Sequence, residues 1–312
     1  MTDFVHLPVM AREALYYLAC RPGGVYVDGT AGGGGHSLEI LKATNGAIKL
    51  IGIDRDADAL KAAAKTLEGY KDRVTLVKEN FRNIRKVLEG LGVKEVDGIL
   101  LDLGVSSYQF DASNRGFSFR LDARLDMRMD QSQGESAYEM VNMQGSAELA
   151  RIFKLYGQER FAGRIAGAII TAREKRPVET TGELAGIVYQ AIPRRFHEEG
   201  QHPATRVFQA LRIAVNDEME GLKAGLHEGF NALKSGGRFA VISFHSLEDR
   251  IVKENFRHLA ADCVCPPRIP QCVCGKKAEA RILTPRPVVA ADEEIKTNPR
   301  ARSAKLRAIE KL

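Results

Sequence analysis

The sequence predicts an α/β protein, in which a doubly wound parallel sheet carries an inserted helical subdomain. Two observations predict this class. Short segments rich in β-branched residues recur through the first hundred residues, and segments with the apolar spacing of amphipathic helices separate them. From residue 110 the alternation stops, and helical patterns continue until a further strand pattern at 238–244.

The expected strands are short and bounded by turn residues. They are VYVD (25–28), KLIGID (49–54), VTLVKE (74–79), DGILLDL (97–103) and RFAVISF (238–244). The segments HSLEILKA and DADALKAAAKTLEGY separate the first three strands, and their apolar residues recur every three or four positions, as in crossover helices.

Too much chain separates the fourth and fifth strands for a single crossover connection. We therefore expect a discontinuous sheet domain at 1–109 and 206–312, with a helical, substrate-recognising subdomain at 110–205. This insertion opens with DASNRGFSFRLDARLDMRMDQSQG, a charged segment without periodicity that is typical of a functional loop. A helix over ATRVFQALRIAVNDEMEGL, with one apolar face, is expected to return the chain to the sheet domain.

Composition excludes some classes of protein and leaves others open. The 312 residues are 44% hydrophobic, enough to bury one large core or two modest ones. There is no apolar stretch long enough for a membrane span and no secretory signal pattern, so we expect a cytoplasmic protein without a membrane partner. The net charge of +6 is compatible with a polyanionic partner but does not identify one.

The segment VDGTAGGGGHS (27–37) predicts a ligand-binding turn between the first strand and a helix. Glycines let the backbone approach a ligand closely, although Thr30 stands where the dinucleotide fingerprint has its first glycine, and a tight turn without a ligand stays open. Asp54 ends the second strand, where an acid binds ribose hydroxyls or caps a turn. Because Asp28 would repel a pyrophosphate and attract a sulfonium, we hypothesise that S-adenosylmethionine binds here rather than NAD.

Asp102 ends the fourth strand, at the sheet edge where α/β proteins place reacting groups. The exocyclic amine of cytosine or adenine is a poor nucleophile, because its lone pair is delocalised into the ring. A carboxylate that accepts its N–H groups, assisted by the carbonyls of Leu103 and Gly104, would localise the lone pair and stabilise the developing positive charge. The alternative is an acid that caps the following turn.

Several longer motifs carry a family resemblance. They are DGTAGGGGHS, DGILLDLGVSS, RGFSF, LDMRMD, HPATRVFQALRIAVN, SFHSLEDRIVK and NPRARSAKLR. From about His6 to the C-terminus, the chain resembles the bacterial 16S rRNA (cytosine-N4) methyltransferases, the MraW family. The resemblance implies a class I, Rossmann-like methyltransferase fold, S-adenosylmethionine as donor, and N4-methylation of a cytidine in the decoding centre of the small ribosomal subunit.

The resemblance also implies a set of donor-binding residues. They are Gly34, Gly35, His36, Asp54, Phe81, Asp102 and Gln109. The charge argument for a sulfonium ligand adds Asp28 to this set. Without the resemblance, we would assign Phe81 to the apolar core. The chain departs from the family pattern at Tyr108 and at Ala123 and Arg124, where proline or glycine is usual, so the local backbone is expected to differ. Asp102 as the catalytic acceptor is inferred from its position.

Basic and imidazole side chains are the candidate contacts to 16S rRNA. His202 and Arg206 lie at the junction after the insertion, where a cleft could receive an unstacked cytidine. The terminal segment 296–312 holds six Lys or Arg against one Glu, so Arg300 and Arg302 are expected to hold RNA or lock the terminus, unless the segment is a solvated tail.

The motif SFHSLEDR contains Ser, His and Asp, but it lacks the elbow of a nucleophilic serine. We interpret Ser246 and Asp249 as a capping box, and we leave His245 as a candidate that faces the substrate.

Four of the five cysteines form two C-x-C pairs, at 263, 265, 272 and 274. Zinc knuckles usually separate their paired ligands by two or more residues, so reduced thiols and structural zinc both stay open. We expect no metal in catalysis. The competing functions are a DNA amino-methyltransferase, an NAD-dependent oxidoreductase and a non-catalytic rRNA-binding assembly factor, and the oligomeric state is left open.

Overall fold

The computed structural model describes residues 8–105, 115–197, 200, 202–266 and 271–312. The chain forms two compact units. The sheet unit comprises Met1–Gly104 and Met219–Leu312, and the helical unit comprises Val105–Glu218. No helix among the described residues is long and apolar enough to cross a membrane.

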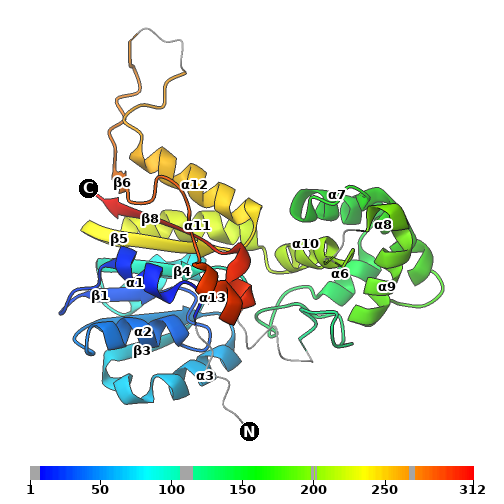
Figure 1. The fold of residues 1–312 in the computed structure, drawn as a ribbon, viewed down its shortest axis with the longest axis horizontal. Coiled ribbons are helices and arrows are strands. Elements are labelled where there is room, and N and C mark those ends of the chain that lie inside the picture. The colour runs from blue at the N-terminus through cyan, green and yellow to red at the C-terminus, as the bar shows by residue number, and fades with distance from the viewer. Residues whose placement is uncertain (1–7, 106–114, 198–199, 201, 267–270) are drawn as a thin grey trace. The chain divides into compact units, whose positions relative to one another are not determined.

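The sheet unit is built on eight strands in one sheet (Figure 1). They are β1 (Val25–Asp28), β2 (Lys49–Asp54), β3 (Val74–Lys78), β4 (Val96–Asp102), β5 (Leu233–Ser243), β6 (Ala280–Ile282), β7 (Val288–Val289) and β8 (Lys305–Lys311). The order is β3-β2-β1-β4-β5-β8-β6, and β7 also pairs with β8. The first five strands of this order are parallel, which confirms the predicted sheet, and β8 runs antiparallel to its neighbours.

The strand order creates a topological switch point between β1 and β4. From β1 the chain proceeds outward through β2 to β3, and it then returns to the other side of β1 for β4 and β5. The connections that follow β1 and β4 therefore run in opposite directions along the sheet. At such a point, an open α/β sheet binds its ligands outside the carboxyl ends of the strands. Asp28 and Asp102 end these two strands.

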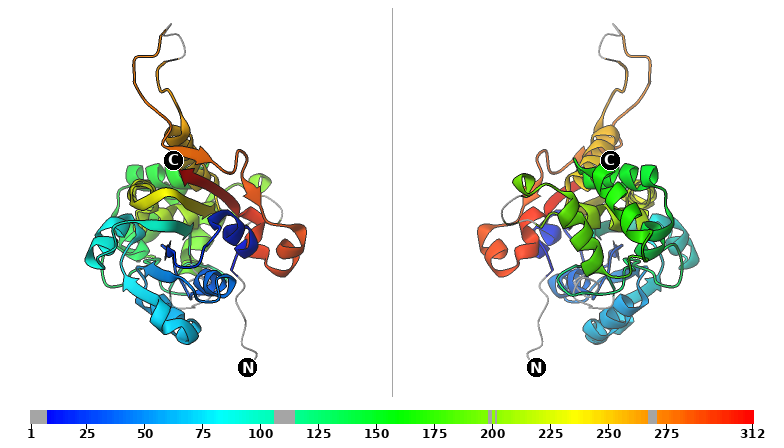
Figure 2. Two further views of the ribbon diagram at one scale, coloured as in Figure 1. Left: turned by 90° about the vertical axis from the view of Figure 1, so that its left-hand side faces the viewer. Right: turned by 90° about the vertical axis from the view of Figure 1, so that its right-hand side faces the viewer.

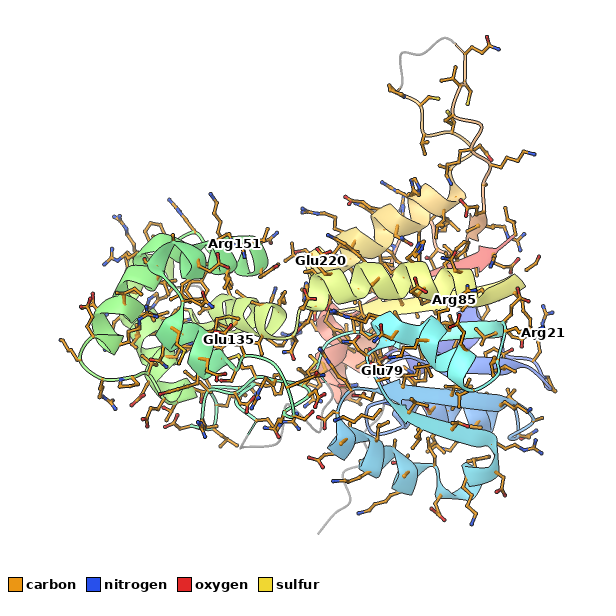
Figure 3. The ribbon with its side chains drawn as sticks, turned by 180° about the vertical axis from the view of Figure 1, so that it is seen from behind. Arg21, Glu79, Arg85, Glu135, Arg151 and Glu220 are labelled. Carbon is orange, nitrogen blue, oxygen red and sulfur yellow. The ribbon has the colours of Figure 1, made fainter. Side chains whose placement is uncertain are left out.

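Helices cover both faces of the sheet because strand residues alternate between two apolar clusters. Val27, Ile99 and Leu101 face one cluster, whereas Tyr26 and Leu100 face the other. The elements of this unit are α1 (Ala11–Leu18), α2 (Gly35–Ala43), α3 (Ala57–Thr66), η1 (Glu68–Arg73), η2 (Phe81–Asn83), α4 (Ile84–Gly90), α11 (Glu218–Ala232), α12 (Ser246–Ala260), α13 (Asp292–Thr297) and η4 (Pro299–Ser303). Figure 1 views the face that α1 and α2 cover, and Figure 3 views the opposite face, with α4 and α11 in front.

The helical unit has a core of its own. Its elements are α6 (Ala137–Met143), α7 (Ser146–Gly157), α8 (Ala162–Arg173), α9 (Thr181–Ala191), η3 (Arg194–Phe196) and α10 (Thr205–Val215). Buried residues from all five α-helices, including Val141, Phe153, Ile165, Val188 and Leu211, form one apolar cluster. Capping boxes begin α6 at Ser136 and α9 at Thr180.

The expected helix over 204–222 is wrong in one respect, because the chain breaks it into α10 and α11. Asp217 adopts a left-handed conformation with φ 48°, and the preceding Asn216 side chain bonds to the backbone of Met127 and Met129. α10 packs against α7, where Gly157 allows close approach to the backbone of Arg206. It therefore belongs to the helical unit, and the chain re-enters the sheet unit at Met219 instead of at residue 206.

Candidate functional site at the carboxyl edge of the sheet

The glycine turn joins β1 to α2 and is held by bonds to the neighbouring strands. The backbone N–H of Gly32 donates to Asp54 Oδ2 at 2.8 Å, and that of Ala31 donates to the carbonyl of Ile53 at 2.9 Å. Gly34 has φ +85°, and a Cβ there would lie 3.2 Å from Cα of Ala63. This position therefore requires glycine for both its conformation and its contact with α3.

Gly33 differs from Gly34 because a Cβ at this position would meet no atom of the described residues within 4 Å. Its φ also lies outside the left-handed region. The fold of the sheet unit therefore gives no packing reason for glycine here. The missing Cβ instead leaves backbone open on the outer side of the turn, where a ligand can approach it.

Asp28 is completely buried beneath the turn. Its Oδ2 accepts a hydrogen bond from Ser37 Oγ at 2.7 Å, and its Oδ1 accepts from the backbone N–H of Thr30 at 3.3 Å. Burial raises the pKa of this carboxyl, although the nearby His36 and these two bonds oppose the shift. The structure changes our interpretation of Asp28, since an inaccessible carboxylate holds the turn together and does not present itself to a ligand.

Asp54 is partly exposed at the end of β2. Its carboxylate holds both the glycine turn and the backbone just before α3. Its Oδ2 accepts the N–H of Gly32, and its Oδ1 accepts the N–H of Asp56 at 2.9 Å. Burial raises its pKa to about 6, against the effect of these two bonds. Each carboxylate oxygen has a second lone pair, so the group retains the capacity to accept a hydroxyl proton from a ligand.

Asp102 and His36 bring the fourth strand and the glycine turn together. The Oδ2 of Asp102 lies 3.4 Å from Nε2 of His36, which is in the first turn of α2 and nearly buried. The backbone N–H of Asp102 donates to Thr30 Oγ1 at 2.6 Å, so the turn also fixes the end of β4. Burial lowers the pKa of His36, but the Asp102 carboxylate and the charges of Asp28 and Glu294 together raise it above its usual value.

Among the described residues, three buried atoms at this edge lack an aligned hydrogen-bond partner: Asp102 Oδ1, His36 Nε2 and His245 Nε2. The two imidazole nitrogens each lie near a carboxylate, His36 Nε2 at 3.4 Å from Asp102 Oδ2 and His245 Nε2 at 3.1 Å from Glu248 Oε1. Buried polar atoms are normally satisfied, so unpartnered ones indicate a place where a ligand bonds. Within the part of the chain that the structure describes, the unpartnered Asp102 oxygen is the strongest sign of a binding site at this edge.

Phe81 follows β3 and is half-buried. Its ring lies against Gly225 of α11, where a Cβ would meet the ring at 2.4 Å, and it packs on the apolar cluster of that face. Glu79, labelled in Figure 3, holds the preceding turn by accepting from the N–H of Asn80 at 2.8 Å and from Asn83 Nδ2 at 3.1 Å. Phe81 thus packs on the apolar core, as the sequence indicated. It is also partly exposed beyond the end of β3.

His245 follows β5, whose carboxyl end lies at the same edge as that of β4. It is the N-cap of α12: its Nδ1 accepts from the backbone N–H of Glu248, and the Glu248 carboxylate accepts from the N–H of His245. The predicted capping box at Ser246 and Asp249 is therefore wrong by one residue. Asp249 instead pairs with Arg307 of β8, with Oδ1 2.6 Å from Nε.

The basic C-terminal segment is largely part of the sheet unit. β8 pairs with β5 and buries Leu306, Ala308 and Ile309, so this segment is not a solvated tail. Arg300 and Arg302 lie in η4 just before it, half-buried and exposed respectively. The expectation that the terminus is locked onto the fold is thus met by β8.

His202 lies in the helical unit among aromatic side chains, directly before α10. Its ring centroid is 4.7 Å from that of Phe119 and 5.8 Å from that of Tyr189, and Tyr189 in turn lies 4.5 Å from His197. We call these four residues the aromatic group. Burial and then the charge of His197 lower the pKa of His202, which favours the neutral ring. Arg206 follows in the first turn of α10, and Gln109 lies outside the described residues.

The charged segment expected to be a functional loop is mostly structural from residue 115 onward. Leu125, Met127 and Met129 are buried, and the Arg115 guanidinium donates to the carbonyls of Arg128 and Met129 at 3.1 and 3.0 Å. Apolar side chains at every second position are the signal of an extended segment with one buried face, and this signal was present in the sequence.

The family model of the MraW methylase family matches residues 3–312. The chain belongs to this family. The Ribosomal RNA small subunit methyltransferase H of Geobacter sulfurreducens is 56% identical over 309 residues, which cover 99% of each chain. The protein of the same name from Trichlorobacter lovleyi is 55% identical over 312 residues, the full length of both, and that of Symbiobacterium thermophilum is 52% identical over 309 residues, 99% of this chain and 97% of its own.

Membership of the MraW methylase family confirms the predicted activity class, and the parallel sheet with its switch point between β1 and β4 confirms the predicted fold class. The enzyme is a methyltransferase that uses S-adenosylmethionine, on an α/β sheet unit of the Rossmann-like type with inserted helices. The oxidoreductase alternative is therefore wrong. The residues at the carboxyl edge fit such a donor: open backbone lies at Gly33, a carboxylate capable of accepting ribose hydroxyls lies at Asp54, and Asp102 keeps one oxygen unpartnered.

Sequence reasoning missed two residues of this site. Ser37 bonds the buried Asp28, and Thr30 links the turn to the backbone of Asp102. The available signal was weak: two small hydroxyl residues flank the glycines, where they usually cap helices or turns. Only the placement of β1 beside β4 assigns them to the site.

Proposed function

We propose that this enzyme methylates N4 of one cytidine in the decoding centre of 16S rRNA, on the small ribosomal subunit. Its donor edge supports this proposal, together with relatives more than half identical to it that carry the name Ribosomal RNA small subunit methyltransferase H. The observation that carries the chemistry is the Asp102 carboxylate at the end of β4, with Oδ1 unpartnered beside the glycine turn. Because small subunits are assembled in the cytoplasm of bacteria, the proposal places the enzyme there.

Asp102 is the proposed catalytic residue. When bound, S-adenosylmethionine supplies an electrophilic methyl group on a sulfonium. A cytosine amine donates an N–H to Oδ1 of Asp102, which localises the nitrogen lone pair and stabilises the positive charge that develops there. The new N–C bond would replace the methyl–sulfur bond of the donor, which would leave as a neutral thioether. The proton that the amine loses would pass to Asp102 and then to solvent. The neighbouring His36 imidazole faces Oδ2 at 3.4 Å, so that Oδ1 is left for the base.

The donor-binding roles follow from the same edge. Gly34 and Gly35 form the turn into α2, and Asp54 accepts bonds from the ribose hydroxyls. Phe81 offers its exposed edge to the adenine, and we propose that Gln109 completes the set. Asp28 acts by positioning the turn and by its charge, without touching the donor.

The helical unit supplies the proposed RNA contact through the aromatic group. RNA-binding proteins recognise unstacked bases largely by stacking them on aromatic rings. Tyr189 is 43% exposed, and the ring of His202 is tilted only 30° from it. With Arg206 nearby in sequence, these rings form a surface suited to a splayed single-stranded segment of rRNA. Arg300 and Arg302 offer phosphate contacts from the sheet unit, and His245 borders the carboxyl edge.

The deciding experiment uses small subunits isolated from cells that lack this gene. They are incubated with the purified enzyme and isotopically labelled S-adenosylmethionine, and the rRNA nucleosides are then analysed by mass spectrometry. Labelled N4-methylcytidine, close to one per small subunit, is the expected product. The Asp102→Asn variant, checked for intact donor binding, is the matched control and should leave the subunits unlabelled.

Other outcomes would overturn the proposal. Label in another nucleoside would contradict the assigned atom, and label only in added DNA would indicate a DNA amino-methyltransferase. Tight binding to subunits without transfer, by an enzyme that binds the donor, would indicate an assembly factor that does not catalyse methylation.

A further inference from the structure

A hairpin between α12 and β6 carries four cysteines and stands away from the rest of the sheet unit. All three figures show it projecting beyond the end of α12 (Figures 1, 2 and 3). We call residues 261–266 and 271–279 the cysteine hairpin. Its described residues contain no helix or strand, and Val264 and Val273 are 49% and 77% exposed. An apolar core therefore does not hold this segment.

The four thiols nevertheless converge on one point. Their sulfur atoms all lie within 4.8 Å of one another, although the two C-x-C pairs come from opposite arms of the hairpin. Cys272 Sγ lies 3.4 Å from Cys263 Sγ, 3.6 Å from Cys274 Sγ and 4.0 Å from Cys265 Sγ, and Cys263 and Cys274 are 3.8 Å apart. Four thiols on a hairpin without an apolar core have no intrinsic attraction that would gather them in this way.

These separations match the ligand shell of one tetrahedral ion. A Zn–S bond of about 2.3 Å places the corners of a tetrahedron about 3.8 Å apart. Disulfide bonds would instead bring two sulfurs to about 2.05 Å, and all four cysteines are free. An iron–sulfur cluster spreads four thiolates over two or four irons, so its ligands would not all lie as close together as those of a single ion.

The backbone supports the same arrangement. The N–H of Cys265 donates to Cys263 Sγ at 3.4 Å, that of Val264 to Cys274 Sγ at 3.4 Å, and that of Val273 to Cys265 Sγ at 3.5 Å. N–H donors aimed at sulfur stabilise thiolates and orient them, as the outer shell of a metal site does. Zinc knuckles usually have two or more residues between paired ligands, and here there is only one. The two C-x-C segments nevertheless face each other, so their four sulfur atoms still meet at one point.

We propose that Cys263, Cys265, Cys272 and Cys274 bind one zinc ion, which holds the two cysteine-bearing arms of the hairpin together. Four thiolates at tetrahedral distances select zinc or a single iron, and zinc, which needs no redox partner, is the usual structural ion in such sites. At the base, the hairpin is closed without metal, because the N–H of Glu279 donates to the carbonyl of Leu259 at 2.8 Å. The ion therefore orders the exposed part beyond this bond.

The zinc site lies at the sheet edge opposite to the donor site. α12 starts after the carboxyl end of β5 and leads away from it, and β6 pairs with the stretch of β8 that lies against the amino end of β5. The proposed ion is therefore structural and takes no part in methyl transfer. The inference is independent of the proposed RNA substrate.

The test is the metal content of the full-length protein, purified without chelators and measured by mass spectrometry of the elements. We expect one zinc per chain. In the Cys272→Ser and Cys274→Ser variants, the zinc content per chain should fall about tenfold or more. Cys20→Ser, which alters the one cysteine outside the hairpin, should keep its zinc. Cobalt added to the metal-free protein should give the intense visible bands of a tetrahedral thiolate site.

Donor binding and circular dichroism check that each variant is folded, since the hairpin does not contribute to the donor site. Removal of zinc should make the hairpin susceptible to limited proteolysis while donor affinity stays unchanged. The proposal is overturned by metal contents near zero with four titratable thiols, by disulfides in non-reducing peptide mapping, by stoichiometric iron, or by zinc that survives in both serine variants.

Discussion

Nε2 of His36 lies 3.4 Å from Oδ2 of Asp102, and this contact joins the helix that follows the glycine turn to the end of the fourth strand. It explains how one carboxylate serves two purposes. One oxygen faces the imidazole of the donor-binding turn, and the other has no partner among the described residues. The methyl donor and the nucleophile are thus expected to meet where β1 and β4 end.

The first prediction concerns Asp102. Replacement by Asn keeps the shape but removes the charge that localises the amine lone pair, and proton-transfer groups typically contribute about 10²–10⁴-fold to rate. We expect kcat to fall by that amount and donor affinity to fall much less. Single-turnover methyl transfer and calorimetric titration of the donor measure the two effects separately. A variant with normal kcat would remove Asp102 from the mechanism.

The His36–Asp102 contact predicts a pH dependence of stability. Because the pKa of His36 is raised in the folded state, its stabilising contribution is complete below the unfolded value of 6.5 and is lost as the pH rises through the folded pKa. The difference in Tm between the wild type and His36→Gln should therefore be largest in mildly acidic buffer and shrink above neutrality. A difference that grows with pH would contradict the ion pair.

Asp54 predicts a second pH effect with the opposite direction. Burial raises its pKa to about 6, so the carboxylate that would accept ribose hydroxyls is ionised above that pH and protonated below it. Donor affinity should decrease as the pH falls through about 6. Titrations of S-adenosylhomocysteine across this range measure the effect, and Asp54→Asn should bind weakly with no inflection. If the variant kept the inflection, another group would be responsible.

Gly33 and Gly34 form a matched pair of test positions. Alanine at Gly34 must adopt a positive φ and press on Ala63, which should cost about 1–3 kcal/mol of stability. Alanine at Gly33 meets open space, so the free energy of unfolding should stay nearly unchanged while donor affinity falls. Chemical denaturation and donor titration of both variants separate the two roles. Normal donor binding by Gly33→Ala would show that the turn is only structural.

The bond between Ser37 and Asp28 predicts a coupled loss of stability. Ser37→Ala leaves a fully buried carboxyl without its hydroxyl donor, which should cost about 1–3 kcal/mol. The double variant with Asp28→Asn should be less destabilised than the sum of the two single variants, because both remove the same bond. Ser303→Ala, at an exposed position, is the control. Strict additivity would mean that the two side chains act independently.

The parts of the fold that follow from local pattern were predictable. Strands β1 to β4 appear as β-branched segments between turns, and Asp54 and Asp102 end theirs as expected. The role of Asp28 was not predictable, because whether a strand-end acid faces a ligand or the interior depends on how the first turn of α2 folds back over it. Its partner Ser37 is reached only through that turn.

The break between α10 and α11 was hidden for a similar reason. The apolar face continues across Asn216 and Asp217, so periodicity alone indicates one helix. The interruption lies at Asp217, where φ is 48°, and the Asn216 side chain beside it bonds to Met127 and Met129 of a distant segment. Only the tertiary fold brings that segment to it.

The last prediction concerns the aromatic group. If Tyr189 stacks a splayed base, its replacement by alanine should cost about 1–3 kcal/mol of RNA binding, seen as a higher KM for small subunits. Tyr189→Phe should retain binding, since stacking needs the ring and not the hydroxyl. Tyr16→Ala removes a still more exposed tyrosine from α1 of the sheet unit and should leave KM unchanged. Donor affinity should be the same in all three variants, because Tyr189 belongs to the helical unit and the donor edge to the sheet unit. A fall in kcat without a change in KM, or equal effects of Tyr189→Ala and Tyr16→Ala, would place the RNA contact elsewhere.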